Sequence, residues 1–101
     1  IMETNVQFVK MTTSEYLQGF VQKKLDKLSK KFNWIIKADV FYKLEKDPKG
    51  KSKICEIQLS LPGPRIFAIS KEESFEAATD ETIRDIEKQL KKQKSDMKTY
   101  L

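Results

Sequence analysis

Histidine is absent from this sequence of 101 residues, and cysteine occurs once. Catalytic sites that pair serine or cysteine with an imidazole, and metal sites of the HExxH type, are therefore excluded. The single Cys55 cannot form an intrachain disulfide, and without histidine it makes a poor zinc site. No apolar run approaches the roughly 20 residues that span a bilayer. We expect a soluble cytoplasmic protein without cofactor, metal site, membrane contact, small-molecule substrate or enzymatic activity.

Glycine and proline are also scarce, with three of each in the chain. Pro62-Gly63-Pro64 is typical of a turn and is too short to cradle a phosphate group. Apolar residues make up 39% of the sequence and are spread along it, which predicts one small domain with a folded core. We expect this domain to cover residues 1–95, followed by a short C-terminal tail over residues 96–101.

The hydrophobic periodicity alternates between two values along the chain. A period of 3.6 predicts helices over residues 14–32 and 73–94, with Thr12 or Ser14 as the cap of the first. A period of two predicts strands over residues 2–9, 34–44, 55–61 and 65–70. In the last of these strands, Phe67 and Ile69 are expected on the buried face.

The order of these elements is β-α-β-β-β-α. A strand, a helix and a strand in succession favour a right-handed crossover between parallel strands, whereas short turns favour antiparallel hairpins. Each strand has one polar face, so both helices should cover the same side of the sheet. The fold class is α+β: a two-layer sandwich with a four-stranded mixed sheet, similar to a double-stranded-RNA-binding domain. The strand order within the sheet stays open.

Positive charge is in excess, with 20 lysines and arginines against 15 acidic residues, but it is unevenly distributed. Residues 23–31 contain five lysines and one aspartate, whereas residues 71–90 carry three basic and seven acidic residues. At about 100° per residue, the basic residues fall within an arc of roughly 120° on the first predicted helix and roughly 100° on the second. The candidate polyanion-binding residues are Lys23, Lys24, Lys27, Lys30 and Lys31 on the first helix, and Arg84, Lys88, Lys91 and Lys92 on the second.

Parallel helices would bring these two arcs together at one end, with the acidic first half of the second helix at the other. Any single lysine is adequately explained as a solvated side chain near a helix C-terminus. Asp80 with Arg84, and Glu87 with Lys91, have the spacing of ordinary intrahelical ion pairs. The two arcs together favour polyanion binding.

Other candidate sites are weaker. Cys55 and Trp34 are expected to pack in the core, and Phe41 is the one aromatic residue that the alternation places on the open face of the sheet. An RNA-recognition motif is disfavoured because its elements follow a different order. A double-stranded-RNA-binding domain fits better, but Lys71-Glu72-Glu73 stands where such domains have a lysine cluster at the start of the last helix, and the characteristic histidine is missing.

Three segments carry a resemblance to a known family. They are Lys24 to Lys30 (KLDKLSK), Phe75 to Ala78 (FEAA) and Ile86 to Lys92 (IEKQLKK). Together with the element order, they make the chain resemble the ribosome hibernation-promoting factor family, also called the sigma-54 modulation protein family, which includes ribosome-associated inhibitor A. The resemblance extends from the first strand to residue 94.

This resemblance implies a non-enzymatic bacterial protein that binds the 16S rRNA of the small ribosomal subunit in the mRNA and tRNA channel and inhibits translation during starvation or stationary phase. It implies rRNA contacts by Lys24, Lys27, Lys30, Lys88, Lys91 and Lys92, whereas Lys23, Lys31 and Arg84 come from the helical arcs alone. The expected form is the short one, a monomer off the ribosome, whose partners are rRNA, ribosomal proteins and inactive ribosome dimers. The alternative is a basic protein-interaction or double-stranded-RNA-binding module unrelated to the ribosome.

Overall fold

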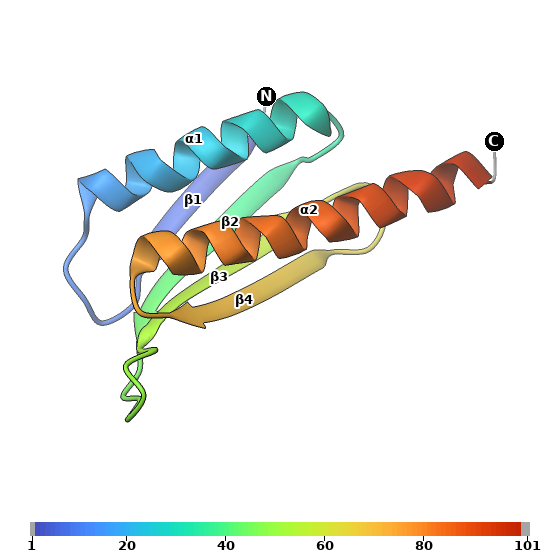
Figure 1. Ribbon diagram of the computed structural model, residues 1–101. Coiled ribbons are helices and arrows are strands. Elements are labelled where there is room, and N and C mark those ends of the chain that lie inside the picture. Colours follow the sequence, from blue (N-terminus) through green and yellow to red (C-terminus); the bar gives the residue numbers. More distant parts are fainter. Residues whose placement is uncertain (1, 100–101) are drawn as a thin grey trace.

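Two helices lie side by side across one face of a four-stranded sheet (Figure 1). The computed structural model describes residues 2–99. The predicted element order and the α+β sandwich are confirmed. The elements are β1 (Glu3–Phe8), α1 (Glu15–Lys31), β2 (Lys37–Leu44), β3 (Lys53–Ser60), β4 (Ile66–Glu72) and α2 (Phe75–Thr99).

The strands follow one another across the sheet in the order β1-β2-β3-β4. β1 and β2 are parallel, and the pairs β2–β3 and β3–β4 are antiparallel, as predicted. The parallel pair requires a crossover, which α1 supplies. A row of small and branched side chains, Val6, Val40, Ile57 and Ala68, crosses all four strands beneath the helices.

Both helices bury the stripe that their periodicity predicts. In α1 the buried residues are Leu17, Val21, Leu25 and Leu28. In α2, Ala78, Thr79, Thr82, Ile86 and Leu90 are buried. Serine caps both helices: the Ser14 hydroxyl accepts a hydrogen bond from the Leu17 amide at 3.2 Å, and the Ser74 hydroxyl accepts one from the Ala77 amide at 3.1 Å. Of the two caps predicted for α1, the structure therefore uses Ser14.

Hydroxyl groups anchor α2 to the middle of the sheet. The Tyr42 and Thr79 hydroxyl oxygens lie 2.6 Å apart, and the Thr82 hydroxyl donates to the Cys55 carbonyl at 3.1 Å. These buried polar groups therefore all have partners, as burial requires. Trp34 is partly buried and packs edge-on against Phe32, in agreement with its predicted packing role.

The facing of β4 is opposite to the prediction. Phe67 and Ile69 are 49% and 44% exposed on the open face, whereas Ile66 and Ala68 are buried. The cause is the register, which pairs Ile66 with the inward Leu59. A shift of one residue moves every side chain of a strand to the other face. Phe41 is therefore not the only aromatic residue on the open face.

Element ends also differ from the prediction, most clearly at β2, which begins at Lys37 rather than residue 34, and at α2. The alternation over residues 34–44 predicts Ile36 and Leu44 on the buried face, but each is 55% exposed. Helix α2 continues to Thr99 instead of ending near residue 94, so residues 96–99 of the predicted tail are helical. Residues 100–101 lie outside the described residues.

Candidate nucleic-acid interface

Helices α1 and α2 run in the same direction, so their C-terminal halves lie next to each other (Figure 1). Two ion pairs between the helices show this parallel arrangement. Lys24 Nζ lies 2.7 Å from Asp80 Oδ1, and Lys31 Nζ lies 2.7 Å from Glu87 Oε2. The partners are seven residues apart on both helices, which requires parallel axes in a common register.

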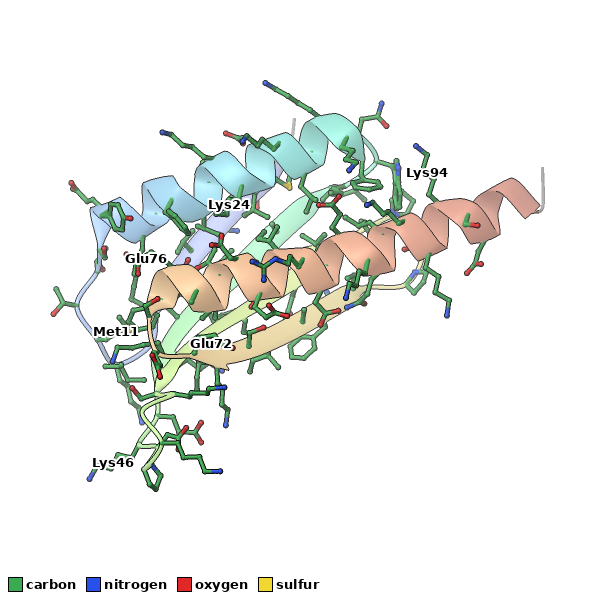
Figure 2. All side chains as sticks on the ribbon, viewed as in Figure 1. Met11, Lys24, Lys46, Glu72, Glu76 and Lys94 are labelled. Carbon is green, nitrogen blue, oxygen red and sulfur yellow. The ribbon has the colours of Figure 1, made fainter. Side chains whose placement is uncertain are left out.

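A groove of about 800 Å³ lies between the two helices. Phe20, Leu28 and Ile83 provide its apolar surface, and Asp26, Asp80 and Glu87 provide carboxylates. Figure 2 shows Lys24 of α1 on the side that faces α2. Six of the nine predicted site residues line this groove: Lys23, Lys24, Lys27, Lys30, Lys31 and Arg84.

The remaining three predicted residues, Lys88, Lys91 and Lys92, are exposed on α2 and do not line the groove. The last residue of α1, Lys31, contacts Glu87, so α2 continues for 12 residues beyond that point, about 18 Å of helix. Figure 1 shows this part of α2 projecting past the sheet. The projection also carries the exposed Lys94, which the prediction omitted because it placed the end of the helix there.

The carboxylates are not confined to the far end of α2, contrary to the predicted separation of charge. Asp80 contacts Lys24 rather than Arg84, and Arg84 instead pairs with Glu81 at 2.6 Å. The predicted pair of Glu87 with Lys91 is present at 3.4 Å. The hydrogen bond from Lys31, supported by Lys91, lowers the pKa of Glu87, so its carboxylate stays charged in the groove.

The basic residues therefore fall into two groups. Lys24, Lys31, Arg84 and Lys91 are held by carboxylates. Within the described residues, the others form no ion pair, and their ammonium groups are free to meet an external anion: Lys23, Lys27, Lys30, Lys88 and Lys92.

Within the part of the chain that the structure describes, neither a metal site nor a reactive thiol accompanies the groove. Among residues 2–99, no cluster of three or more Cys, Asp or Glu side chains could hold a metal ion. Cys55 is fully buried beneath α2, and burial raises the pKa of its thiol from the ordinary 9.0 to about 11. With lysines and an arginine contributed by both helices, the arrangement is suited to binding an anionic surface.

The buried Cys55 should be chemically inert in the folded protein. At pH 8 we expect iodoacetamide to alkylate it at least about 100-fold more slowly than in the urea-unfolded chain, because a rise of two pKa units lowers the thiolate fraction by that factor. Equal rates in the two states would contradict this burial. Because the folded-state pKa is raised, the thiol leaves the free energy of unfolding unchanged below pH 9 and lowers it as the pH rises from 9 towards 11. A Cys55→Ala variant should lose stability less steeply over that range in urea unfolding.

A scan against protein families matches residues 4–98 to the family described as Sigma 54 modulation protein / S30EA ribosomal protein. The chain belongs to this family. Among curated relatives of the S30EA family, the chain is similar to a ribosome hibernation promoting factor from Pseudomonas putida strain KT2440. The two are 28% identical over 100 residues, which cover 99% of this chain and 94% of the relative.

Two solved structures share the fold of this S30EA chain. A ribosomal subunit interface protein from Coxiella burnetii superposes with a TM-score of 0.77 at 23% identity, covering 93% of this chain and 97% of that one. The N-terminal domain of Thermus thermophilus Protein Y superposes with a TM-score of 0.74 at 24% identity, covering 90% of this chain and 96% of that one.

Within the described residues, no helix has the length and apolar character needed to cross a membrane.

Proposed function

We propose that this chain is a ribosome hibernation factor that binds the small ribosomal subunit through 16S rRNA, in the channel for mRNA and tRNA, and thereby inhibits translation under starvation or in stationary phase. The observation that carries the proposal is the groove between two parallel helices, into which both contribute basic side chains. Membership of the S30EA family and the similarity to the Pseudomonas putida hibernation factor support it.

Binding of this kind works through phosphate neutralisation. Lysine and arginine side chains displace the counterions of the RNA, which makes affinity steeply dependent on salt and nearly independent of sequence. The free lysines, such as Lys27 and Lys30, provide the first contacts. Lys24 and Lys31 are paired with Asp80 and Glu87, so each pair carries no net charge, and these two lysines contribute where a phosphate displaces the carboxylate.

Selectivity then comes from shape. The groove and the projecting part of α2 present cations on two surfaces at once, and only an RNA surface that fits both can neutralise all nine proposed residues. The proposed partners are therefore folded rRNA and the ribosomal proteins beside it, in single or dimerised inactive ribosomes. The chain acts by occupying the channel for mRNA and tRNA. Off the ribosome it is a monomer.

The test is co-sedimentation of the purified chain with isolated small and large ribosomal subunits over a range of potassium concentrations. We expect it to sediment with small subunits, to be released as salt rises, and to inhibit translation in an extract at stoichiometric amounts. Sedimentation with large subunits only, or no salt dependence, would contradict the proposal.

The alternative is a protein-interaction module, which the exposed Phe67 and Ile69 on the open face of the sheet favour. Nuclease treatment of the subunits separates the two cases. Binding that survives removal of accessible rRNA would support a protein partner, whereas loss of binding supports the rRNA contact.

A further inference from the structure

The loop between β2 and β3 carries a second group of lysines. It projects from the sheet at the end where both helices begin, away from their basic C-terminal halves (Figure 1). This position follows from the connectivity: the chain leaves the C-terminal end of α1, crosses the sheet once as β2, and then enters the loop. Lys46, Lys49 and Lys51 are all exposed on it. The longest dimension of the molecule is 48 Å.

Hydrogen bonds within the loop hold its backbone in a defined turn. The Glu45 amide donates to the Ser52 carbonyl at 2.9 Å, and the Gly50 amide donates to the Asp47 carbonyl at 3.0 Å. The Lys49 amide donates to Asp47 Oδ1 at 3.0 Å. Gly50 has a φ of +81°, a conformation that favours glycine. The lysines are therefore presented on a built turn.

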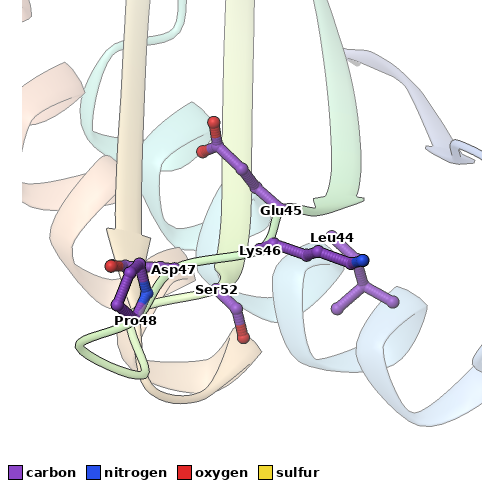
Figure 3. A pocket seen from close by; sticks show the side chains of 6 residues that line it. All are labelled: Leu44, Glu45, Lys46, Asp47, Pro48 and Ser52. Atoms are coloured by element: carbon purple, nitrogen blue, oxygen red, sulfur yellow. The ribbon is translucent and has the colours of Figure 1, made fainter.

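The two acidic residues of the loop are already engaged. Glu45 pairs with Lys71 at 2.5 Å, and Asp47 bonds to the backbone of the turn. Both Glu45 and Lys46 line a hollow of about 590 Å³, and Figure 3 shows them pointing to different sides of the loop. No ion pair with the described residues involves Lys46, Lys49 or Lys51. The loop thus offers three lysines without an ion-pair partner among the described residues, and residues 46–51 keep a net charge of +2 after Asp47 is counted.

We propose that the β2–β3 loop is a second RNA-binding element, which contacts phosphates at the opposite end of the molecule from the helix groove. The inference rests on the proposed function, because the groove and the loop would bind the same folded RNA. Phosphate contacts are made by lysine, whereas the cores of protein interfaces are depleted in lysine and enriched in aromatic residues, which residues 45–52 lack. An RNA partner therefore fits this loop better than a protein partner.

Two contacts at opposite ends fix the orientation of the molecule on its partner. Once the groove is bound, the loop meets nearby phosphates at a high effective concentration, so a few weak contacts add substantially to affinity. The first turn of α2 and the residues before it are acidic, and Figure 2 shows Lys46 farther out on the projecting loop than Glu72 and Glu76. The loop can therefore reach an RNA surface that these carboxylates would repel.

Two matched variants of the full chain test this proposal. Asp47→Asn keeps an oxygen acceptor for the Lys49 amide and raises the charge of the loop by one, whereas Lys49→Gln lowers it by one. We expect affinity for small ribosomal subunits to rise about two- to fivefold in the first and to fall by a similar factor in the second. Replacing Lys46, Lys49 and Lys51 together by glutamine should reduce the salt dependence, expressed as log affinity against log salt, by about 2 to 3.

Unchanged affinity in all three variants, with a Lys27→Glu/Lys88→Glu variant of the helices still impaired, would overturn the loop proposal and leave the proposed function intact. A second measurement does not depend on the ribosome: titration of the labelled protein with a short RNA stem-loop, followed by amide chemical shifts. Shifts at residues 46–51 support the proposal even if small subunits do not bind. Shifts there with a polyglutamate peptide but not with RNA would overturn it in favour of an acidic protein partner.

Discussion

Replacing Lys27 and Lys88 together by glutamate is expected to lower the affinity for small ribosomal subunits by at least about 100-fold. Each lysine would lose a charge-assisted contact with phosphate worth about 1.5 kcal/mol or more, and the new carboxylates would add repulsion. The pair was chosen because one residue lines the groove and the other lies on α2 outside it. Co-sedimentation at moderate salt gives the affinity.

Folding should be unaffected by this double reversal. Both side chains are exposed and form no ion pair with the described residues, so the thermal unfolding temperature should change little. The matched control compares Lys27→Gln/Lys88→Gln with Lys10→Gln/Lys37→Gln, which removes the same charge from the β1–α1 connection and the open sheet face. Only the first pair should weaken binding. Equal losses in both would show that net charge, and not the helix surface, sets the affinity.

The opposite change provides an independent check on the groove. Asp80→Asn with Glu87→Gln removes both carboxylates that bridge the helices and raises the charge of the groove by two. Binding should become tighter and more dependent on salt, because Lys24 and Lys31 would then be available for phosphate. Weaker binding would indicate that the carboxylates chiefly position these lysines.

Within β4, Ile66→Ala should destabilise the fold by about 2–5 kcal/mol, whereas Ile69→Ala should cost less than about 1 kcal/mol. The two substitutions remove the same atoms from the same strand. Ile66 is 5% exposed and packs in the core, so its truncation leaves a cavity, while Ile69 is 44% exposed on the open face. Urea unfolding followed by circular dichroism measures both free energies. The reverse ranking would restore the facing that the sequence alternation suggested.

In β4 the sequence pattern does not determine which side chains are buried. Residues 66–69 are apolar at all four positions, so either phase of a period of two fits them. Their facing depends on the pairing of Leu59 with Ile66, which the turn between the strands determines. The helices were predicted more reliably, because a stripe such as Leu17, Val21, Leu25 and Leu28 spans several turns and has only one phase.

The candidate site also has features that the sequence predicts and features that depend on how the helices pack. Helical geometry alone predicts that one side of α1 carries Lys23, Lys27 and Lys30. The structure places all three in one groove. The contacts of Lys24 with Asp80 and of Lys31 with Glu87 join residues 56 positions apart, so they depend on the register between the helices. No local pattern contains that register, and intrahelical spacing suggested a different partner for Asp80.

The repeated interval of these two bridges has a mechanical consequence. Seven residues of helix span about 10.5 Å, so both links share a single axial alignment, and sliding either helix by one turn would break them together. The two ion pairs therefore hold the cations along the groove at a fixed axial spacing. A partner has to match this spacing at all positions at once, or it has to break both ion pairs.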